Sequence, residues 1–369
     1  MRASAGTSDF AGLDRFIEDQ MRTAAIPCLA VGLARNGHVR FARGYGLADV
    51  ARRKRVTVDS IFHLASVTKT VTATGITMLV EDGRLALDEP VNRHLDFAVA
   101  NPFAPDVPIT VRQLQMHISS ISDATYYEVD FRTPGRGSPL ALGDFLRDCL
   151  VPGGAYYSAK GSFSAHAPGC SYDYSNVGYA LLGYLGSRVA GLDFRAYLQE
   201  RLFRRLPMTG LAWRLGDVPL ARRVIPYEPG DGRARPTAPM GFPDWPAGML
   251  RGSIAGFMPF VAAAANGGAV GPARMLNASS MAEMLAMHAP PGLPTWLSGQ
   301  GVDWMESAEG GARHVNHWGG DPGVFTAAYL DPASTTGIAI FTNISATAAS
   351  KGAIKAITRR LLDPDASSA

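Results

Sequence analysis

The chain has 369 residues, of which 47% are hydrophobic and 18% are charged, and these proportions are typical of a soluble globular protein with a large core. Its 35 Lys and Arg and 32 Asp and Glu residues give a formal net charge of +3 and are spread along the chain, so no basic block indicates a nucleic-acid partner. No apolar stretch reaches the roughly 18 residues of a membrane-spanning helix. The three cysteines lack CxxC spacing, so we expect no disulfide framework, no metal site and no other cofactor.

The amino-terminal segment does not have the pattern of a secretory signal. Acidic residues interrupt residues 1–25 at Asp9, Asp14, Glu18 and Asp19, whereas a signal needs an uninterrupted apolar core. We therefore expect a cytoplasmic protein with buried thiols, although a mature chain from which a leader had been removed would look the same.

The first 83 residues predict a helix, two strands and a second helix. Residues 9–23 carry apolar side chains at helical spacing. Residues 28–34 and 39–45 are short apolar runs around Asn36-Gly37, a strong signal for a β-hairpin. A further helix is expected to begin at Ser66, to run through Val80 and to end at Asp82-Gly83.

The rest of the chain is helical in the middle and strand-rich near the end. Helices are expected over residues 109–117, 176–190, 194–202, 254–265, 279–288 and 348–362, and strands over 314–318, 324–330 and 337–342. This order predicts an α/β (α+β) fold, with an antiparallel sheet flanked by N- and C-terminal helices and a large, mostly helical inserted domain. Residues 1–65 with 300–369 would form the sheet domain and residues 66–299 the helical domain, with the active site at their seam.

The most informative segment is the tetrapeptide Ser66-Val67-Thr68-Lys69. Residues at i and i+3 share one face of a helix, so the Lys69 amine can reach the Ser66 hydroxyl and, when neutral, take its proton. The alternative is an ordinary helix start, with Ser66 as its cap and Lys69 on its surface. Two later segments, Tyr174-Ser175-Asn176 and His317-Trp318-Gly319-Gly320, favour the catalytic interpretation.

Together these segments resemble the serine β-lactamase and penicillin-binding-protein superfamily, whose signature is SxxK, SDN and KTG in that order. The Tyr-x-Asn form of the middle element is similar to the class C β-lactamase-like branch, which includes family VIII esterases, D-amino-acid peptidases and acyltransferases. The resemblance covers roughly residues 10–362 and implies a β-lactamase/transpeptidase-like fold.

The resemblance implies a role for each matching residue. Ser66 would be the nucleophile and Lys69 would help to deprotonate it, while Tyr174 would share the general-base role and then protonate the leaving group. Asn176 would orient Lys69 and the substrate, although it could equally cap the following helix. A phenolate at Tyr174 would need two close ammonium or imidazole groups to stabilise it.

The third segment would hold the substrate. The backbone N–H groups of Ser66 and Gly320 would form the oxyanion hole, and His317, Trp318 and Gly319 would bind or orient the substrate. Many relatives have a lysine where this chain has His317, and a histidine is mostly neutral at pH 7. That difference argues against recognition of β-lactams or cell-wall peptides.

These features predict an enzyme, a serine acyl-enzyme hydrolase or acyltransferase that acts on a small-molecule carboxylic ester or amide, with esterase-type hydrolysis favoured. The alternative is an intracellular transacylase of biosynthetic metabolism that passes the acyl group to an amine or alcohol acceptor. A lesser alternative is a catalytically silent binding protein. The sequence leaves the oligomeric state open.

Overall fold

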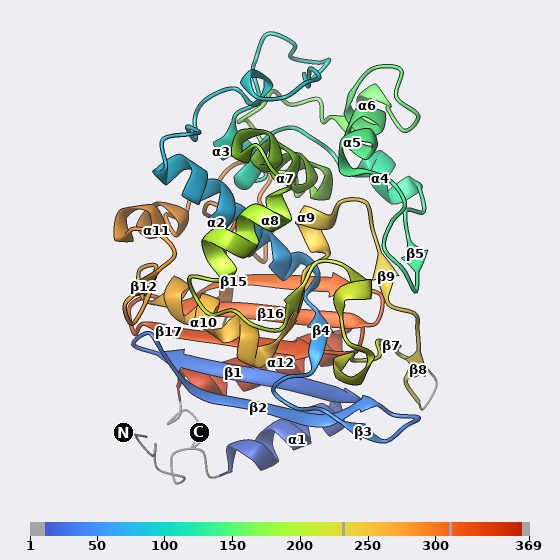
Figure 1. Cartoon of the computed structure of the whole chain (residues 1–369), viewed down its shortest axis with the longest axis vertical. Helices are drawn as coiled ribbons and strands as arrows, with labels where there is room; N and C mark the ends of the chain where they lie inside the picture. Colours follow the sequence, from blue (N-terminus) through green and yellow to red (C-terminus); the bar gives the residue numbers. More distant parts are fainter. Residues whose placement is uncertain (1–11, 231–232, 310–311, 364–369) are drawn as a thin grey trace.

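A computed structural model describes residues 12–230, 233–309 and 312–363 (Figure 1). Its centre is an antiparallel eight-stranded sheet with the strand order β13-β14-β15-β16-β17-β1-β2-β3. The strands are β1 (Cys28–Arg35), β2 (His38–Asp49), β3 (Lys54–Arg55), β13 (Gly299–Gln300), β14 (Met305–Glu309), β15 (Ala312–Asp321), β16 (Val324–Asp331) and β17 (Thr336–Thr342).

The two ends of the chain meet in the middle of this sheet. Strand β1 pairs with β17 from Leu29↔Thr342 to Arg35↔Thr336. The predicted hairpin is confirmed, because Asn36 and Gly37 have φ angles of 51° and 70°, the positive values that a tight turn between twisted strands requires. Chain segments about 300 residues apart thus form one sheet.

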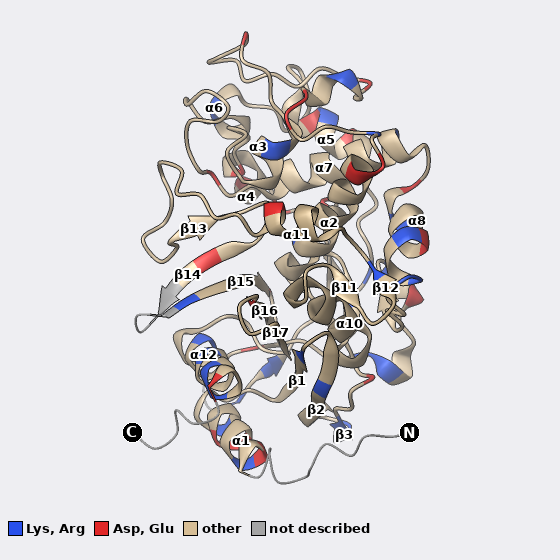
Figure 2. Cartoon of the chain, turned by 90° about the vertical axis from the view of Figure 1, so that its left-hand side faces the viewer, with Lys and Arg blue, Asp and Glu red and all other residues tan. Residues whose placement is uncertain are grey.

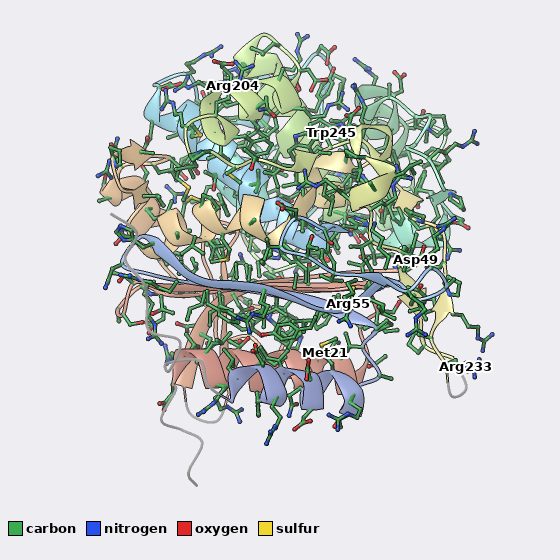
Figure 3. The ribbon with its side chains drawn as sticks, turned by 60° about the horizontal axis from the view of Figure 1, so that its bottom comes forward. Met21, Asp49, Arg55, Arg204, Arg233 and Trp245 are labelled. Carbon is green, nitrogen blue, oxygen red and sulfur yellow. The ribbon has the colours of Figure 1, made fainter. Side chains whose placement is uncertain are left out.

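Both faces of the sheet are covered by helices (Figures 2 and 3). Helices α1 (Leu13–Thr23) and α12 (Ala348–Leu362) lie on one face, where Met21 packs into the core, and α10 (Ile254–Ala265) packs on the other face against β1 and β17. Side chains of β1 alternate between the two cores. Burial on both faces explains why this strand is an unbroken apolar run.

The remaining helices form a second part beside the sheet. They are α2 (Thr68–Glu81), α3 (Val111–Gln115), α4 (Ala124–Glu128), α5 (Leu142–Leu150), α6 (Ala159–Ser162), α7 (Asn176–Ala190), α8 (Phe194–Leu198), α9 (Trp245–Gly248) and α11 (Ala278–Met284). Helix α2 is buried along nearly its whole length and packs against α7 and α9. Its threonines Thr70, Thr74 and Thr77 donate to backbone carbonyls three or four residues earlier, so their hydroxyls are satisfied in the core.

Short strands tie this part together. They are β4 (Ile61–His63), β10 (Arg251–Ser253) and β6 (Leu211–Ala212) in one small sheet, and the pairs β5 (Thr133–Pro134) with β9 (Met240–Gly241), β7 (Tyr227–Glu228) with β8 (Arg235–Pro236) and β11 (Ala269–Val270) with β12 (Ala273–Arg274). Strand β4 leads directly into the segment that carries Ser66.

The predicted fold class is confirmed, and several boundaries differ. The helix expected over residues 109–117 is only α3, because Thr110 caps it with a capping box and His117 has a φ of 58°. The helix expected over 279–288 ends at Met284, since residue 288 pairs with Gln300. The turn expected at 320–323 begins later, because Gly320 and Asp321 still pair with β16. The division into two domains stays a prediction.

Figure 2 shows Lys and Arg residues interspersed with Asp and Glu residues along the ribbon. Within the described ranges, no helix combines the length and the apolar character needed to cross a membrane.

Candidate active site

Ser66 lies in the short 3-10 helix η1 (Ala65–Val67), between β4 and α2. The preceding residue, Ala65, has a φ of 47°, an uncommon value for a residue other than glycine and one that occurs at functional sites. The Leu64 carbonyl accepts a hydrogen bond of 2.6 Å from Thr326 Oγ1 on β16, and the Leu64 N–H donates to Leu250 at 2.9 Å. The nucleophile candidate is therefore held from both sides by distant parts of the chain.

Lys69 is fully buried one turn later, and its amine has three hydrogen-bond partners. Nζ lies 2.7 Å from Asn176 Oδ1, 2.9 Å from the Ala247 carbonyl and 3.2 Å from Ser66 Oγ. The first two partners are oxygens that only accept, so they take two N–H groups of the amine. The third position, toward Ser66, holds either a proton or, in the neutral amine, the lone pair that can receive the hydroxyl proton.

Burial lowers the pKa of Lys69 to about 8, because the charged form loses its hydration. Four buried or half-buried carboxyl groups oppose this shift: Asp244, Asp123, Asp303 and Asp321. The neutral amine is thus accessible near physiological pH, as a general base requires.

Tyr174 lies beside both residues. Its ring centroid is 4.9 Å from Lys69 Nζ, and it lines the same cavity as Ser66. Burial raises the pKa of Tyr174, and the nearby Ser66 side chain opposes the shift. The His117 ring stacks at 4.3 Å from the Tyr174 ring, but burial holds the pKa of His117 well below its ordinary value. With its pKa raised by burial and a neutral imidazole as its neighbour, Tyr174 is a neutral phenol at pH 7.

Asn176 is the first residue of α7, and Asp123 fixes it there. The Asp123 carboxylate accepts from the Asn176 N–H at 2.6 Å, from the Val177 N–H at 3.1 Å and from Ser175 Oγ at 2.8 Å. Ser175 caps the helix by accepting from the Gly178 N–H. The cap is therefore Ser175, which leaves the Asn176 side chain to bind Lys69 through Oδ1 and the Tyr127 hydroxyl through Nδ2.

His317 is completely buried on β15 and does not line the cavity at Ser66. Its Nδ1 lies 3.0 Å from the Trp318 carbonyl, and its Nε2 lies 3.7 Å from Asp303 Oδ1. Burial lowers the pKa of His317 to about 3 and raises that of Asp303 to about 8. His317 is therefore a neutral imidazole at pH 7 and provides no cation on β15.

Trp318, Gly319 and Gly320 alternate across the strand. A Cβ atom at Gly319 would lie 2.8 Å from the Ser66 nitrogen and 2.5 Å from the Leu64 carbonyl oxygen, so only glycine permits this close approach. Gly320 lines the cavity with Ser66. Trp318 points to the opposite face, where it packs against Phe325 at 5.6 Å and beneath Lys355 Nζ at 5.0 Å. The structure does not bring Trp318 to the site, contrary to our expectation that it binds substrate.

Ser66, Tyr174, Asn176 and Gly320 line a cavity of about 640 Å³. Tyr126, Tyr127 and Phe242 also line this cavity, whereas Trp245 lines a neighbouring one.

Carboxyl groups that the sequence analysis missed also surround the site. Asp244 and Asp321 line the cavity, and burial raises their pKa values to about 6 and about 7. Asp321 Oδ2 lies 3.3 Å from His63 Nε2, which also bonds to the Gly248 carbonyl at 2.7 Å. No short sequence pattern marks these aspartates, because they come from separate elements: Asp244 directly precedes α9 and Asp321 ends β15. In the described part of the chain, no three His, Cys, Asp or Glu side chains are grouped to hold a metal ion.

Comparison with known protein families assigns the chain to one of them. The family model described as Beta-lactamase matches residues 13–361. The fold is that of serine β-lactamases and penicillin-binding proteins, and the chain belongs to the beta-lactamase family.

Individual relatives are distant in sequence. Protein flp of Staphylococcus aureus is 27% identical over 217 residues, which cover 58% of this chain and 41% of that protein. The chain thus matches about two fifths of the length of this curated relative. EstCE1, described as a hydrolase with promiscuous acyltransferase activity, has a similar structure, with a TM-score of 0.77, 18% identity and coverage of 97% of this chain and 100% of that one. The D-amino acid amidase of Ochrobactrum anthropi SV3 has a TM-score of 0.74, 23% identity and coverage of 95% and 97%.

Proposed function

We propose that this protein is a serine acyl-enzyme hydrolase that cleaves a small carboxylic ester or amide, with Ser66 as the nucleophile and Lys69 as its general base. The single observation that carries the proposal is the hydrogen-bond set of Lys69. Two fixed acceptors orient the buried amine so that its third position faces Ser66 Oγ at 3.2 Å. A lysine with this geometry and a lowered pKa suits proton abstraction.

The acylation step follows from these positions. Ser66 Oγ attacks the carbonyl carbon while its proton passes to Lys69, and the tetrahedral oxyanion is stabilised by the N–H groups of Ser66 and Gly320. When the bond to the leaving group breaks, Tyr174 gives its hydroxyl proton to the departing alcohol or amine and recovers a proton from Lys69. Water then attacks the acyl-serine by the same path in reverse, which releases the acid and frees Ser66.

Among the possible reactions, we favour hydrolysis of an ester. The chain lacks a permanent cation at residue 317, so a carboxylate next to the scissile bond would gain little there. The printed descriptions of EstCE1 and of the D-amino acid amidase cover a hydrolase with acyltransferase activity and an amidase, which supports an ester or amide as the acyl donor. A cytoplasmic location remains a prediction.

The second candidate is transfer of the acyl group to an amine or alcohol. The carboxyl groups of Asp244 and Asp321 at the cavity favour it, because they would attract a protonated amine acceptor. Product analysis with and without an added amine separates the two: an amide product supports transfer, and release of free acid alone supports hydrolysis.

Intact-protein mass spectrometry with a short-chain p-nitrophenyl ester tests the proposal. The expected result is a mass increase of one acyl group that maps to Ser66 and is absent in Ser66→Ala. A mass that stays unchanged with every ester and amide tested, while the same compounds bind, would favour a catalytically silent binding protein.

A further inference from the structure

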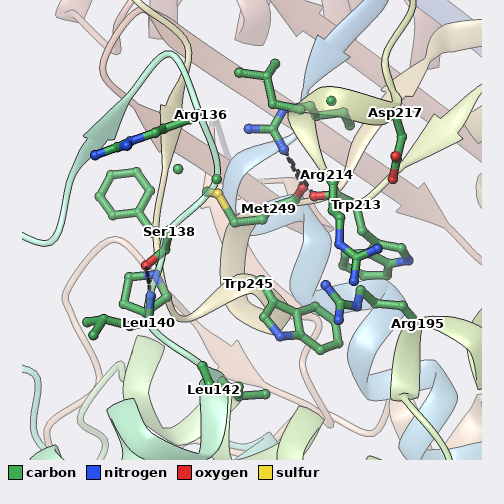
Figure 4. A pocket seen from close by; sticks show the side chains of 18 of the residues that line it. Arg136, Ser138, Leu140, Leu142, Arg195, Trp213, Arg214, Asp217, Trp245 and Met249 are labelled. Atoms are coloured by element: carbon green, nitrogen blue, oxygen red, sulfur yellow. Dashed lines mark hydrogen bonds between the residues drawn. The ribbon is translucent and has the colours of Figure 1, made fainter.

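A second cavity, of about 920 Å³, adjoins the one that contains Ser66 (Figure 4). Phe242 and Met249 line both cavities, so the two share a wall. The second cavity is bordered by the segment after β5, by the loop after β6 and by α9, and it takes no part in the acylation steps above.

This cavity offers flat aromatic surfaces. Trp213 and Trp245 meet edge to face, with their ring centroids 5.1 Å apart. Arg195 lies over the Trp245 ring at 4.8 Å, and Figure 4 shows Arg195 and Arg214 converging beside the two tryptophans. Such a pair of indoles with guanidinium groups at their faces can hold a planar group.

The charge of the lining is strongly positive. Five arginines line the cavity against two aspartates: Arg136, Arg195, Arg214, Arg223 and Arg251, with Asp193 and Asp217. Asp193 is paired with Arg195. The Arg214 carbonyl accepts from the Asp217 N–H at 3.1 Å, and the charge of its guanidinium helps to lower the pKa of Asp193.

Arg251 is the most informative of these cations because it is buried, with 4% of its surface exposed. Its guanidinium donates to the carbonyls of Trp213, Met249 and Met240 and to no carboxylate. A buried charge is costly unless it is compensated, and the carboxyl group that interacts with Arg251 electrostatically, Asp321, lines the neighbouring cavity. An anion in the second cavity would add negative charge on its own side of the guanidinium.

The cavity at Ser66 has the opposite character. Carboxyl side chains line it at Glu128, Asp130, Asp244 and Asp321, and its arginine, Arg132, is paired with Asp130. An anionic group is therefore repelled from the nucleophile and attracted to the neighbouring cavity, which orients a substrate that carries one.

We propose that the arginine-rich cavity binds the anionic end of the substrate, a carboxylate or phosphate attached to a flat aromatic group, while the acyl carbonyl lies at Ser66. The indole faces of Trp213 and Trp245 stack on the flat group, and Arg214 and Arg195 bind its oxyanion. This inference deepens the proposed function and rests on it for the position of the acyl group.

Calorimetric titration of Ser66→Ala tests the binding site without turnover. Benzoate and phenyl phosphate are the anionic probes, and benzyl alcohol is the neutral control. We expect both anions to bind more tightly than the alcohol, and the double variant Arg195→Gln/Arg214→Gln to weaken their binding by about tenfold or more, since it removes the charged hydrogen-bond donors. The tighter of the two anions identifies the oxyanion.

Arg15→Gln is the control for the loss of a positive charge away from the cavity, because Arg15 is exposed on α1; it removes one charge where the double variant removes two. Thermal unfolding of each variant shows whether it is folded. The inference would be overturned if the protein bound the anions no more tightly than the alcohol. It would also be overturned if the folded double variant bound the anions as tightly as the parent protein does.

Kinetics connect the cavity to the substrate. Aromatic p-nitrophenyl esters with and without a carboxylate on the acyl group should differ in KM, and the double variant should abolish that difference. If neutral esters acylate Ser66 but the carboxylate gives no advantage in KM, the inference fails and the proposed function stands. If the anions bind but no ester acylates Ser66, the proposed function fails instead.

Discussion

The pH dependence of catalysis follows from the burial of Lys69. A pKa of about 8 in place of 10.5 corresponds to about 3 kcal/mol in favour of the neutral amine. At pH 7 roughly a tenth of the molecules then carry the neutral base, about 300-fold more than for a solvent-exposed lysine. Because the deprotonated form is the active one, kcat/KM should rise with pH, pass its midpoint near pH 8 and level off above it.

The assay is hydrolysis of a p-nitrophenyl ester between pH 5.5 and 9.5, corrected for spontaneous hydrolysis. Lys69→Ala should lower kcat by about 10² or more, the usual loss for a general base, whereas Lys351→Ala, an exposed lysine on α12, should not. Among the carboxylates that raise the pKa of Lys69, Asp244 contributes most. Asp244→Asn should therefore move the midpoint of the pH profile to lower pH. A flat profile, or near-normal turnover in Lys69→Ala, would refute the assignment.

Three further changes test the neighbouring parts of the site. Tyr174→Phe should lower kcat by about 10² for an alkyl ester but much less for a p-nitrophenyl ester, whose leaving group departs without a proton. Tyr157→Phe is the control. Equal losses of kcat for both esters in Tyr174→Phe would contradict proton transfer from Tyr174 to the leaving group. Asp123→Asn should lower the free energy of unfolding by about 2–4 kcal/mol, because an amide cannot accept from all three donors; an unchanged urea midpoint would disprove this. Gly319→Ala should abolish acylation, since the added Cβ would lie too close to the backbone of Ser66. A Cβ added at Gly320 would lie 3.8 Å from its nearest neighbour, Ala346, so Gly320→Ala should remain active. Similar acylation rates in both variants would count against the close-approach argument.

Local patterns in the sequence predicted the elements that depend on local chemistry. Helix α7 begins and ends at the predicted residues, and the hairpin turns at Asn36-Gly37. The pairing of Ser66 with Lys69 likewise needs only one helical turn. In each case, neighbouring residues contain the whole signal.

Features that depend on distant contacts could not be predicted in this way. Strands β13 and β14 are short; β14 is held by pairing with β15, and β13 by pairing with β14. Asp123 reaches the catalytic segment across a separation of 53 residues to Asn176, and no motif surrounds it.

The position of Trp318 is different, because the sequence did contain the signal. Side chains alternate along a strand, so a strand that places residues 317 and 319 toward the nucleophile must turn residue 318 to the opposite face. Strict use of this alternation would have assigned Trp318 to the core beneath the sheet, where it packs with Phe325 and Tyr329.

The two cavities also give a physical interpretation of His317. A lysine on β15 would place a permanent cation close to Lys69, and the repulsion between them would lower the pKa of Lys69 further. With a neutral imidazole beside Asp303, the strand provides no charge for a substrate anion. The arginines of the adjoining cavity provide that charge instead. If the anionic end of the substrate binds there, specificity depends on the distance between the anion and the acyl carbonyl, so esters of increasing length between these two groups should show one preferred length. A uniform KM across that series would show that the arginine-rich cavity does not bind the substrate that reacts at Ser66.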